Sequence, residues 1–328
     1  MSDTALHAAD PILGSSRAAG SIRAFARLAA GVDAPVLITG ETGTGKGALA
    51  AAVHRQSRRA AAQLVAVNCA GVPESLFESE FFGHARGAFT GAHAARRGLF
   101  EQAHAGSLFL DEIGELSLGL QAKLLTAIEA GEVRRLGSEG IRRVDARIIA
   151  ATAVDIEAAA MDGTFRIDLY HRLLVLAFHM PPLRERGGDS LLLARHFVST
   201  YAARHGRRVG DLHPDTIRII HEHPWPGNIR QLAHAMEAAV LMADGPSLTP
   251  RNLPARLLGR IAPGTDPASG RYSFYGSRGD ERAVILAALR AHHGNMTRTA
   301  RALRMSRNTL RRRILQLDID PPHTGIGR

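Results

Sequence analysis

Short apolar runs alternate with helical patterns along the first 180 residues of the chain. Each run has four to six residues, which is the length expected of a strand that is buried on both faces. The runs are 36–39, 64–67, 107–110, 146–151 and 174–178. Between them, apolar residues recur at helical spacing, starting with an amphipathic stretch that ends near residue 30. This alternation predicts an α/β fold in which a parallel sheet is flanked by helices.

The strand pattern stops after the Pro-Pro pair at 181–182. Helical patterns follow near 189–204, 214–222 and 228–242, and they predict a small all-helical lid. Residues 259–279 contain so many Gly and Pro residues that we expect a flexible linker. The chain therefore divides into a short leader (1–11), an α/β subdomain (12–180), a helical lid (181–258), the linker (259–279), a C-terminal domain (280–320) and a tail (321–328).

The C-terminal domain has the apolar spacing of three short helices. The apolar positions are Ile285, Leu286 and Leu289, then Ala300 and Leu303, then Leu310, Ile314 and Leu317. Thr297 and Ser306 are expected to cap the second and third helices. This pattern predicts a helix-turn-helix whose third helix reads DNA. The residues expected to contact DNA are Thr297, Ser306, Arg307, Asn308, Thr309, Arg311, Arg312 and Arg313.

Charge supports this interpretation, because almost all of the excess positive charge lies near the C-terminus. The chain has 41 basic and 31 acidic residues, a net charge of +10. Residues 271–316 contain eleven Arg and two acidic residues, a net charge of +9. Such a basic helical segment is typical of proteins that bind the phosphate backbone of nucleic acids. An Arg-rich solvated helix would show the same composition.

Cysteine usage and the missing targeting patterns favour the cytoplasm. Cys69 is the single cysteine, so no intrachain disulfide can form, and the N-terminus lacks the pattern of a secretion signal. The longest apolar runs are far too short to cross a membrane. We therefore expect a cytoplasmic protein without membrane insertion.

A glycine-rich segment directly follows the first predicted strand and opens a helix, which is the context of a phosphate-binding loop. Glycines there let successive backbone N–H groups converge on phosphate oxygens, and Lys46 adds a point charge. The alternative is a glycine-rich turn without a ligand. The sequence thus predicts a site for ATP with Mg²⁺, and its loop residues are Gly40, Glu41, Thr42, Gly43, Thr44, Gly45, Lys46 and Gly47.

Two carboxylates, Asp111 and Glu112, come directly after the buried run 107–110. Ligands of open α/β sheets bind at the carboxyl ends of the strands, so these side chains should meet the loop. Asp111 would hold Mg²⁺ through water, and Glu112 would orient and deprotonate the water that attacks the γ-phosphate. Gly47 stands where the general motif has a Ser or Thr hydroxyl for the metal. The alternative for such a carboxylate pair is a helix N-cap.

Six further motifs occur in a fixed order. They are Asn68-Cys-Ala70, Phe82-Gly-His84, Gly87-Ala-Phe-Thr-Gly-Ala92, Gly163-Thr-Phe-Arg-Ile-Asp-Leu-Tyr-His-Arg172, Pro181-Pro-Leu-Arg-Glu-Arg186 and Trp225-Pro-Gly-Asn-Ile-Arg230. With them, the chain closely resembles the bacterial enhancer-binding proteins, which are AAA+ activators of sigma-54 RNA polymerase. The resemblance covers about residues 12–320 and implies an AAA+ P-loop NTPase with a helical lid, followed by a Fis-type helix-turn-helix that binds double-stranded DNA as a dimer.

The resemblance implies that a nucleotide-driven loop contacts the sigma factor. That loop is Gly87, Ala88, Phe89, Thr90, Gly91 and Ala92, with Phe89 and Thr90 touching sigma-54 and residues 137–143 assisting. Asn68 would restrain Glu112 until the loop is engaged, which its short amide-to-carboxylate reach allows.

The resemblance also implies a ring, by family precedent a hexamer, in which neighbouring subunits share each site. Arg166 and Arg172 would reach the neighbour's γ-phosphate, and Arg230 would read the phosphates from the lid; a surface salt bridge is the alternative for each. Thr152 would belong to the sensor strand. The family usually has Glu where Gly47 stands and Asn where Ala153 stands, so hydrolysis is expected to be slower here.

The function implied is an ATP-dependent transcriptional activator that binds upstream enhancer DNA and remodels closed sigma-54 RNA polymerase complexes into open ones. Because we see no room for an N-terminal sensor domain, we expect control by a separate inhibitor protein, a partner subunit or expression level. Three alternatives stay open. They are a DNA-binding regulator whose ring no longer hydrolyses ATP, an unrelated AAA+ remodeller such as a helicase loader, and a hetero-oligomer with a paralogous subunit.

Overall fold

The computed structural model describes residues 12–70, 73–89, 92–257, 282, 285–289, 292, 295–303, 307–317 and 319. The expected leader and tail and the linker 259–279 lie outside the described residues. The described residues comprise the α/β subdomain, the lid and the core of the C-terminal domain.

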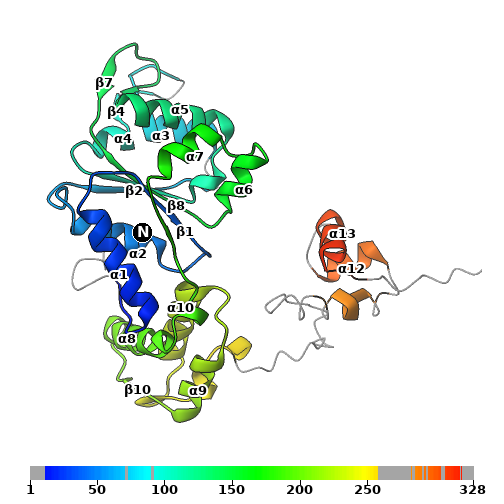
Figure 1. The fold of residues 1–328 in the computed structure, drawn as a ribbon. Coiled ribbons are helices and arrows are strands. Elements are labelled where there is room, and N and C mark those ends of the chain that lie inside the picture. The colour runs from blue at the N-terminus through cyan, green and yellow to red at the C-terminus, as the bar shows by residue number, and fades with distance from the viewer. Residues whose placement is uncertain are drawn as a thin grey trace, which may run out of the picture.

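A parallel sheet forms the centre of the α/β subdomain, as the sequence predicts (Figure 1). Its order is β2-β5-β8-β1-β9, and every neighbouring pair is parallel. The strands are β1 (Val36–Thr39), β2 (Leu64–Asn68), β5 (Ser107–Asp111), β8 (Arg147–Thr152) and β9 (Leu176–His179). Because all run the same way, the carboxyl ends of β1, β5 and β8 lie along one edge of the sheet.

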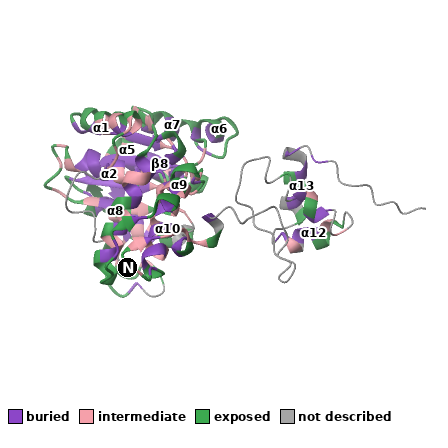
Figure 2. Ribbon diagram, turned by 90° about the horizontal axis from the view of Figure 1, so that it is seen from below, coloured by how far each residue is buried: buried purple, intermediate pink, exposed green. Residues whose placement is uncertain are grey.

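Helices cover both faces of this sheet, and the strands alternate their side chains between the two resulting cores. Ile38 and Ile149 pack with α1 (Arg17–Ala30) and α2 (Lys46–Arg55). Leu37 and Ile148 pack in the other core, which includes Phe100. That core is covered by α3 (Glu74–Phe82), α4 (Leu99–Gln102), α5 (Leu118–Ala130), α6 (Ile156–Met161) and α7 (Ile167–Leu173). Figure 2 shows the central strands as the buried layer.

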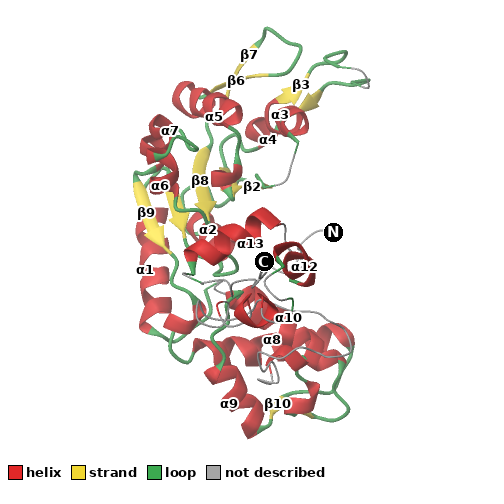
Figure 3. Ribbon diagram, turned by 90° about the vertical axis from the view of Figure 1, so that its right-hand side faces the viewer, coloured by secondary structure: helices red, strands yellow, loops and turns green. Residues whose placement is uncertain are grey.

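Two short antiparallel strand pairs lie at the end of the α/β subdomain opposite the lid (Figures 1 and 3). One pairs β3 (Gly83–His84) with β4 (Arg96–Arg97), and the other pairs β6 (Glu132–Arg134) with β7 (Ile141–Arg143). The backbone joins the two pairs, because Ala85 donates to the carbonyl of Leu136 at 2.9 Å. The first pair carries the loop that contains Phe89.

The lid is helical, which confirms the patterns predicted for it. Its helices pack around Trp225, whose side chain is 1% exposed and whose indole Nε1 donates to the carbonyl of Ile220 at 2.9 Å. The elements are η2 (Leu183–Glu185), α8 (Asp189–His205), β10 (Asp211–Leu212), α9 (Pro214–Glu222), α10 (Asn228–Leu241), β11 (Ser247–Leu248), η3 (Pro250–Asn252) and η4 (Ala255–Leu257). The two short strands pair in parallel.

Residues 12–16 tie the start of the chain's described part to the lid. Ile12 packs in the core under the sheet, whereas Leu13 packs against the core of the lid. The carboxylate of Asp189, which is fully buried at the start of α8, accepts three hydrogen bonds from this segment. They come from the backbone N–H groups of Ser15 and Ser16 at 2.8 and 3.0 Å and from the Ser16 hydroxyl at 2.6 Å.

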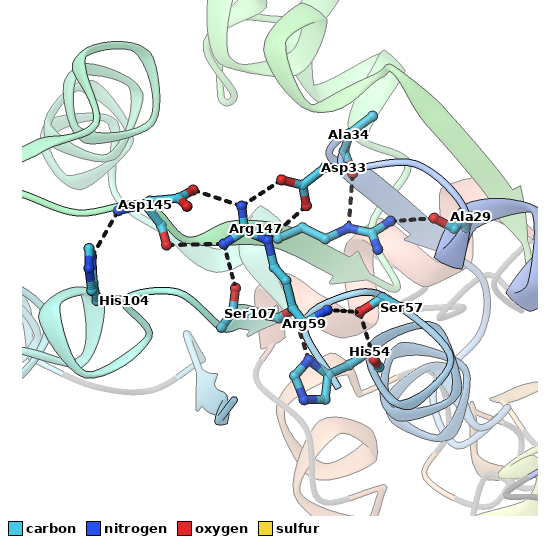
Figure 4. A network of polar contacts seen from close by, with 11 residues as sticks. Ala29, Asp33, Ala34, His54, Ser57, Arg59, His104, Ser107, Asp145 and Arg147 are labelled. Carbon is cyan, nitrogen blue, oxygen red and sulfur yellow. Dashed lines mark hydrogen bonds and ion pairs between the residues drawn. The ribbon is translucent and has the colours of Figure 1, made fainter. Parts of the chain in front are cut away.

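A cluster of polar side chains lies at the edge of the sheet where β1 and β8 begin (Figure 4). Arg59 forms ion pairs with Asp33 and Asp145, which precede β1 and β8. Arg147 is 3% exposed and donates to the carbonyl of Ala29 at 2.7 Å, at the end of α1. These guanidinium groups therefore join the end of α1 to the segments that precede β1 and β8.

The C-terminal domain has its own apolar core. Residues 285–289 are helical, followed by α12 (Met296–Ala302) and α13 (Arg307–Gln316). Their buried side chains include Ile285, Leu289, Ala300, Leu303, Leu310, Ile314 and Leu317, as predicted for a three-helix domain. Across the part of the chain described here, no helix combines the length and apolarity needed to span a membrane.

The predicted cap of α12 is wrong. This helix begins one residue before Thr297, and the side-chain oxygen of Asn295 accepts from the backbone N–H groups of Thr297 and Arg298 at 3.1 and 3.0 Å. Asn is as good a cap as Ser or Thr, so it wins once the helix starts at Met296. Ser306, the predicted cap of α13, lies outside the described residues.

Candidate active site

The predicted phosphate-binding loop connects β1 to α2 and depends on its glycines. Gly40, Gly43 and Gly45 have φ values of +138°, +81° and +97°, in the region that favours glycine. A Cβ on Gly40 would also lie 2.7 Å from the carbonyl oxygen of Met180. The fully buried Thr44 closes the turn, since its hydroxyl donates to the carbonyl of Glu41 at 2.8 Å. The loop therefore has a backbone conformation that glycine adopts readily and that residues with a Cβ rarely adopt.

Lys46, the first residue of α2, is 5% exposed. Its Nζ donates to the carbonyl of Gly40 at 2.9 Å and lies 3.5 Å from Glu112 Oε1. A buried ammonium is costly unless it has such partners. The lysine, after β1, and the predicted catalytic carboxylate, after β5, thus meet at the carboxyl edge of the sheet, where β8 lies between the two strands.

Asp111 ends β5 and Glu112 follows it, as predicted. Glu112 has φ +54°, an uncommon left-handed conformation for a residue with a side chain. Its Oε2 accepts from the backbone N–H of Ala153 at 2.9 Å. Although it occupies the cap position of η1 (Ile113–Glu115), its side chain makes no capping hydrogen bond there. Burial, and then the charge of Glu112, raise the pKa of Asp111 above its ordinary value.

These groups surround a hollow of about 250 Å³ between the loop and the lid. It is lined by Gly43, Gly45, Lys46, Gly47, Asp111, Glu112, Ile229 and Arg230. Two cationic side chains and the loop backbone suit phosphate oxygens, and the adjacent carboxylates of Asp111 and Glu112 suit a divalent cation. Ile229 is a lining residue that the sequence interpretation did not name.

Thr152 and Asn68 lie at the ends of strands next to this hollow, but their polar atoms have other partners. Thr152 is fully buried, does not line the hollow, and its hydroxyl accepts from the N–H of Val154 at 3.0 Å. The side-chain oxygen of Asn68 accepts from the N–H of Ala70 at 2.9 Å. In this structure Glu112 is therefore held by the backbone at Ala153, and its restraint by Asn68 stays a prediction.

Arg166 and Arg172 lie on the surface at α7. Arg166 precedes the helix and forms a two-pronged ion pair with Asp168, with an Nη2 to Oδ2 distance of 2.7 Å. Arg172, near the end of α7, is exposed. Neither residue lines the hollow of its own subunit. Both side chains are exposed to solvent.

The predicted sigma-contacting loop is described up to Phe89 and again from Ala92, with Thr90 and Gly91 outside the described residues. Phe89 is 46% exposed, and its ring lies 5.1 Å from that of His84 between centroids. Gly87 donates to the carbonyl of Ala92 at 2.8 Å, which closes the base of the loop. A large apolar side chain is thus presented far from the lid.

For the predicted DNA-contacting surface, the structure describes only part of the set. Thr297, Arg307, Arg311 and Arg313 are exposed. Ser306 and the side chains of Asn308, Thr309 and Arg312 lie outside the description. Exposure on the third helix suits contact with a phosphate backbone, and the roles of the individual residues remain predictions.

The sequence interpretation also missed the lid residues that surround the loop. Arg184, Arg186 and Asn228 all hydrogen bond to residues 41–44. The signal was present, because all three belong to motifs that the sequence analysis singled out. Nothing in their local pattern, however, says that they meet the loop.

Three family models match the chain in succession. The model described as the Sigma-54 interaction domain matches residues 12–179. The AAA+ ATPase lid domain matches residues 184–269, and the Bacterial regulatory protein, Fis family, matches residues 278–317. The first match alone covers half of the chain.

Curated relatives and solved structures agree with these matches. The chain is 44% identical over 293 residues to Regulatory protein AtoC of Escherichia coli (strain K12), covering 88% of this chain and 64% of that protein. It is 44% identical over 299 residues to Transcriptional regulatory protein ZraR of the same strain, covering 91% of this chain and 67% of that one. A crystal structure of NtrX from Brucella abortus in complex with ATP has a TM-score of 0.70 and 30% identity, covering 97% and 71% of the two chains. This chain spans less than two thirds of the length of AtoC.

Proposed function

The chain belongs to the family of sigma-54-dependent transcriptional regulators with an AAA+ core and a Fis-type DNA-binding domain, and we propose that it uses ATP hydrolysis to convert closed sigma-54 RNA polymerase complexes into open ones. The observation that carries the proposal is the hollow in which Lys46, Glu112 and Arg230 converge. A hollow with that chemistry, in a chain that also presents Phe89 on an exposed loop, suits a motor better than a passive DNA-binding protein.

The residues of the hollow divide the work of hydrolysis. Lys46 and Arg230 would neutralise phosphate oxygens, and Glu112, oriented by the N–H of Ala153, would take the proton of the attacking water. Mg²⁺ bound with ATP would neutralise phosphate charge. Asp111 would hold it through water, because Gly47 supplies no hydroxyl.

Hydrolysis is proposed to require assembly into a ring. Arg166 and Arg172 lie outside their own subunit's hollow, so they would act on the nucleotide of a neighbour. The pair between Arg166 and Asp168 is open to solvent, where ion pairs are easily exchanged. By the precedent of the family, the proposed ring is a hexamer.

The exposed loop and the C-terminal domain would connect the motor to its partners. The loop 87–92 would press on sigma-54, with Phe89 and Thr90 at the contact, while α13 would hold the protein on upstream double-stranded DNA. Because promoters and polymerase are in the cytoplasm, we place the protein there.

Steady-state ATPase activity measured across protein concentration tests the motor. We expect the activity per subunit to rise steeply with concentration as rings form. Glu112→Gln should lower it by about a hundredfold or more, since general-base catalysis contributes on that scale. Glu115→Gln, an exposed carboxylate three residues away, should not change it. Lack of turnover at every concentration would instead favour a DNA-binding regulator with an inactive ring.

Gly47 and Ala153 favour a second arrangement, in which this subunit works beside a paralogous one. Both replace side chains that the family usually supplies at the site, so a partner with the usual residues would raise turnover. Native mass spectrometry of rings formed by co-expressed subunits distinguishes mixed from uniform rings.

A further inference from the structure

We propose that Glu41 is a positioning residue, which joins the phosphate-binding loop to the lid so that the lid sets nucleotide affinity. The inference rests on the proposed function, because it takes ATP and ADP as the nucleotides of the site. The mechanism above gives Glu41 no chemistry, and its side chain does not line the hollow.

The Glu41 carboxylate is bound from two separate elements of the lid. Arg184, in η2, donates to both oxygens, at 3.0 Å to Oε2 and 2.7 Å to Oε1. The side-chain amide of Asn228, at the start of α10, donates to Oε2 at 3.0 Å. Such two-pronged contacts restrict orientation as well as distance. These bonds lower the pKa of Glu41, first through Arg184, so the carboxylate stays ionised.

Asn228 is itself held in a single orientation. It is fully buried and has φ +51°. Its side-chain oxygen accepts from the N–H of Leu183 at 2.7 Å, so its amide nitrogen faces the loop. That nitrogen also donates to the carbonyl of Thr42 at 3.1 Å. An amide fixed at its oxygen end therefore connects η2, α10 and the loop.

The lid continues along the same side of the loop. The carbonyl of Gly43 accepts from the N–H groups of Ile229 and Arg230 at 2.9 and 3.3 Å. Arg186, which is 2% exposed, donates to the carbonyl of Thr44 at 2.6 Å. The lid thus binds acceptor groups of residues 41–44, so these contacts do not compete with phosphate for the N–H groups of the loop.

This arrangement should make nucleotide affinity depend on the position of the lid. Ile229 and Arg230 line the hollow and directly follow Asn228, so a shift of α10 that opens the hollow must also stretch the bonds to Glu41. Glu41 and Arg184 are about equally exposed, at 42% and 44%, so their pair can open without burying a charge. The two hydrogen bonds between Arg184 and Glu41 orient the loop, and the solvent exposure of both side chains allows the pair to open.

A double-mutant cycle on ADP binding tests the proposal, because ADP cannot be turned over. Calorimetry would compare Glu41→Gln, Arg184→Gln and the double variant in the full chain. We expect each single variant to weaken ADP about fivefold, which is the upper range for an exposed pair, and the double variant to be no weaker than either single one. Arg184→Lys, which keeps the charge but not the fork, should lie between. Glu185→Gln is the control, since that exposed carboxylate also lies near Arg184, at 3.8 Å, but does not reach the loop.

A second pair of variants separates positioning from folding. Asn228→Gly keeps the backbone conformation but loses the amide, while Asn228→Asp keeps the acceptor for Leu183 and sets a carboxylate against Glu41. We expect both to weaken ADP, the Asp variant more. Because Asn228 is fully buried and each variant loses hydrogen bonds there, the unfolding temperature should fall as well, and calorimetry is done at a temperature at which each variant is folded. Additive effects in the cycle, or unchanged ADP affinity in folded variants, would overturn the positioning role. Wild-type protein that binds neither ADP nor ATP would instead refute the proposed function.

Discussion

Replacing Asp189 with Ala should destabilise the lid, because this carboxylate is the shared acceptor for the segment 12–16. It accepts two backbone N–H groups and one hydroxyl, and it is fully buried. A hydrogen bond to a charged group contributes about 1.5–3 kcal/mol, and each buried donor left without a partner costs about 1–3 kcal/mol. Ser15 is exposed, so water can recover part of this loss. We therefore expect a loss of about 3 kcal/mol.

Urea unfolding followed by tryptophan fluorescence measures this loss directly. Trp225 is the single tryptophan and lies in the lid core, so the signal reports the unit that Asp189 belongs to. The midpoint should fall while the slope stays constant. Asp215→Ala, at an exposed carboxylate in the same lid, should change stability by less than about 0.5 kcal/mol. If Asp189→Ala behaves like this control, the tether between 12–16 and the lid contributes no stability and the reasoning fails.

Three further predictions follow from other parts of the structure. Burial raises the pKa of the Cys69 thiol to about 12, so it should resist alkylation at pH 8 in native protein and react after unfolding, as a mass shift would record. Gly43→Ala should weaken ADP about tenfold or more, since its Cβ would lie 2.4 Å from the carbonyl oxygen of Gly227 at a φ of +81°. Gly20→Ala, in α1, where a Cβ would meet nothing within 4 Å, should not weaken ADP, and calorimetry compares the two. Burial lowers the pKa of His54 below its ordinary 6.5. The neutral imidazole therefore contributes to stability above pH 6.5, and this contribution is lost as the pH falls below that value. The unfolding temperature of His54→Gln should accordingly fall less between about pH 7 and 5 than that of wild type.

The sheet and the lid were predictable because their patterns are strong. Strands buried on both faces leave continuous apolar runs, and the lid helices keep a regular helical period. The pairs β3–β4 and β6–β7 were missed, because strands of two or three residues leave no period to detect. The cap of α12 was placed two residues late, since Asn295 and Thr297 are both residues that cap helices and the apolar pattern did not fix where the helix starts.

The candidate site was likewise predictable only in part. The loop and the carboxylates after β5 were legible because each set is contiguous in sequence, and the sheet brings them together. The lid contacts were not, since Arg184 and Asn228 are 143 and 187 residues from Glu41 along the chain. Only the packing of the lid on the sheet creates that neighbourhood. The roles of the individual site residues and the domain boundaries stay predictions.

Open-complex formation at a sigma-54 promoter tests the central claim most directly. Purified protein, sigma-54 RNA polymerase and promoter DNA with an upstream site would be mixed with ATP or with a non-hydrolysable analogue, and melting of the promoter would be followed by permanganate footprinting. We predict that the promoter melts with ATP but not with the analogue. The Thr90→Ala and Glu112→Gln variants should not melt it with either nucleotide. Melting that proceeds equally with the analogue, or wild-type protein that hydrolyses ATP yet melts no promoter, would contradict the account.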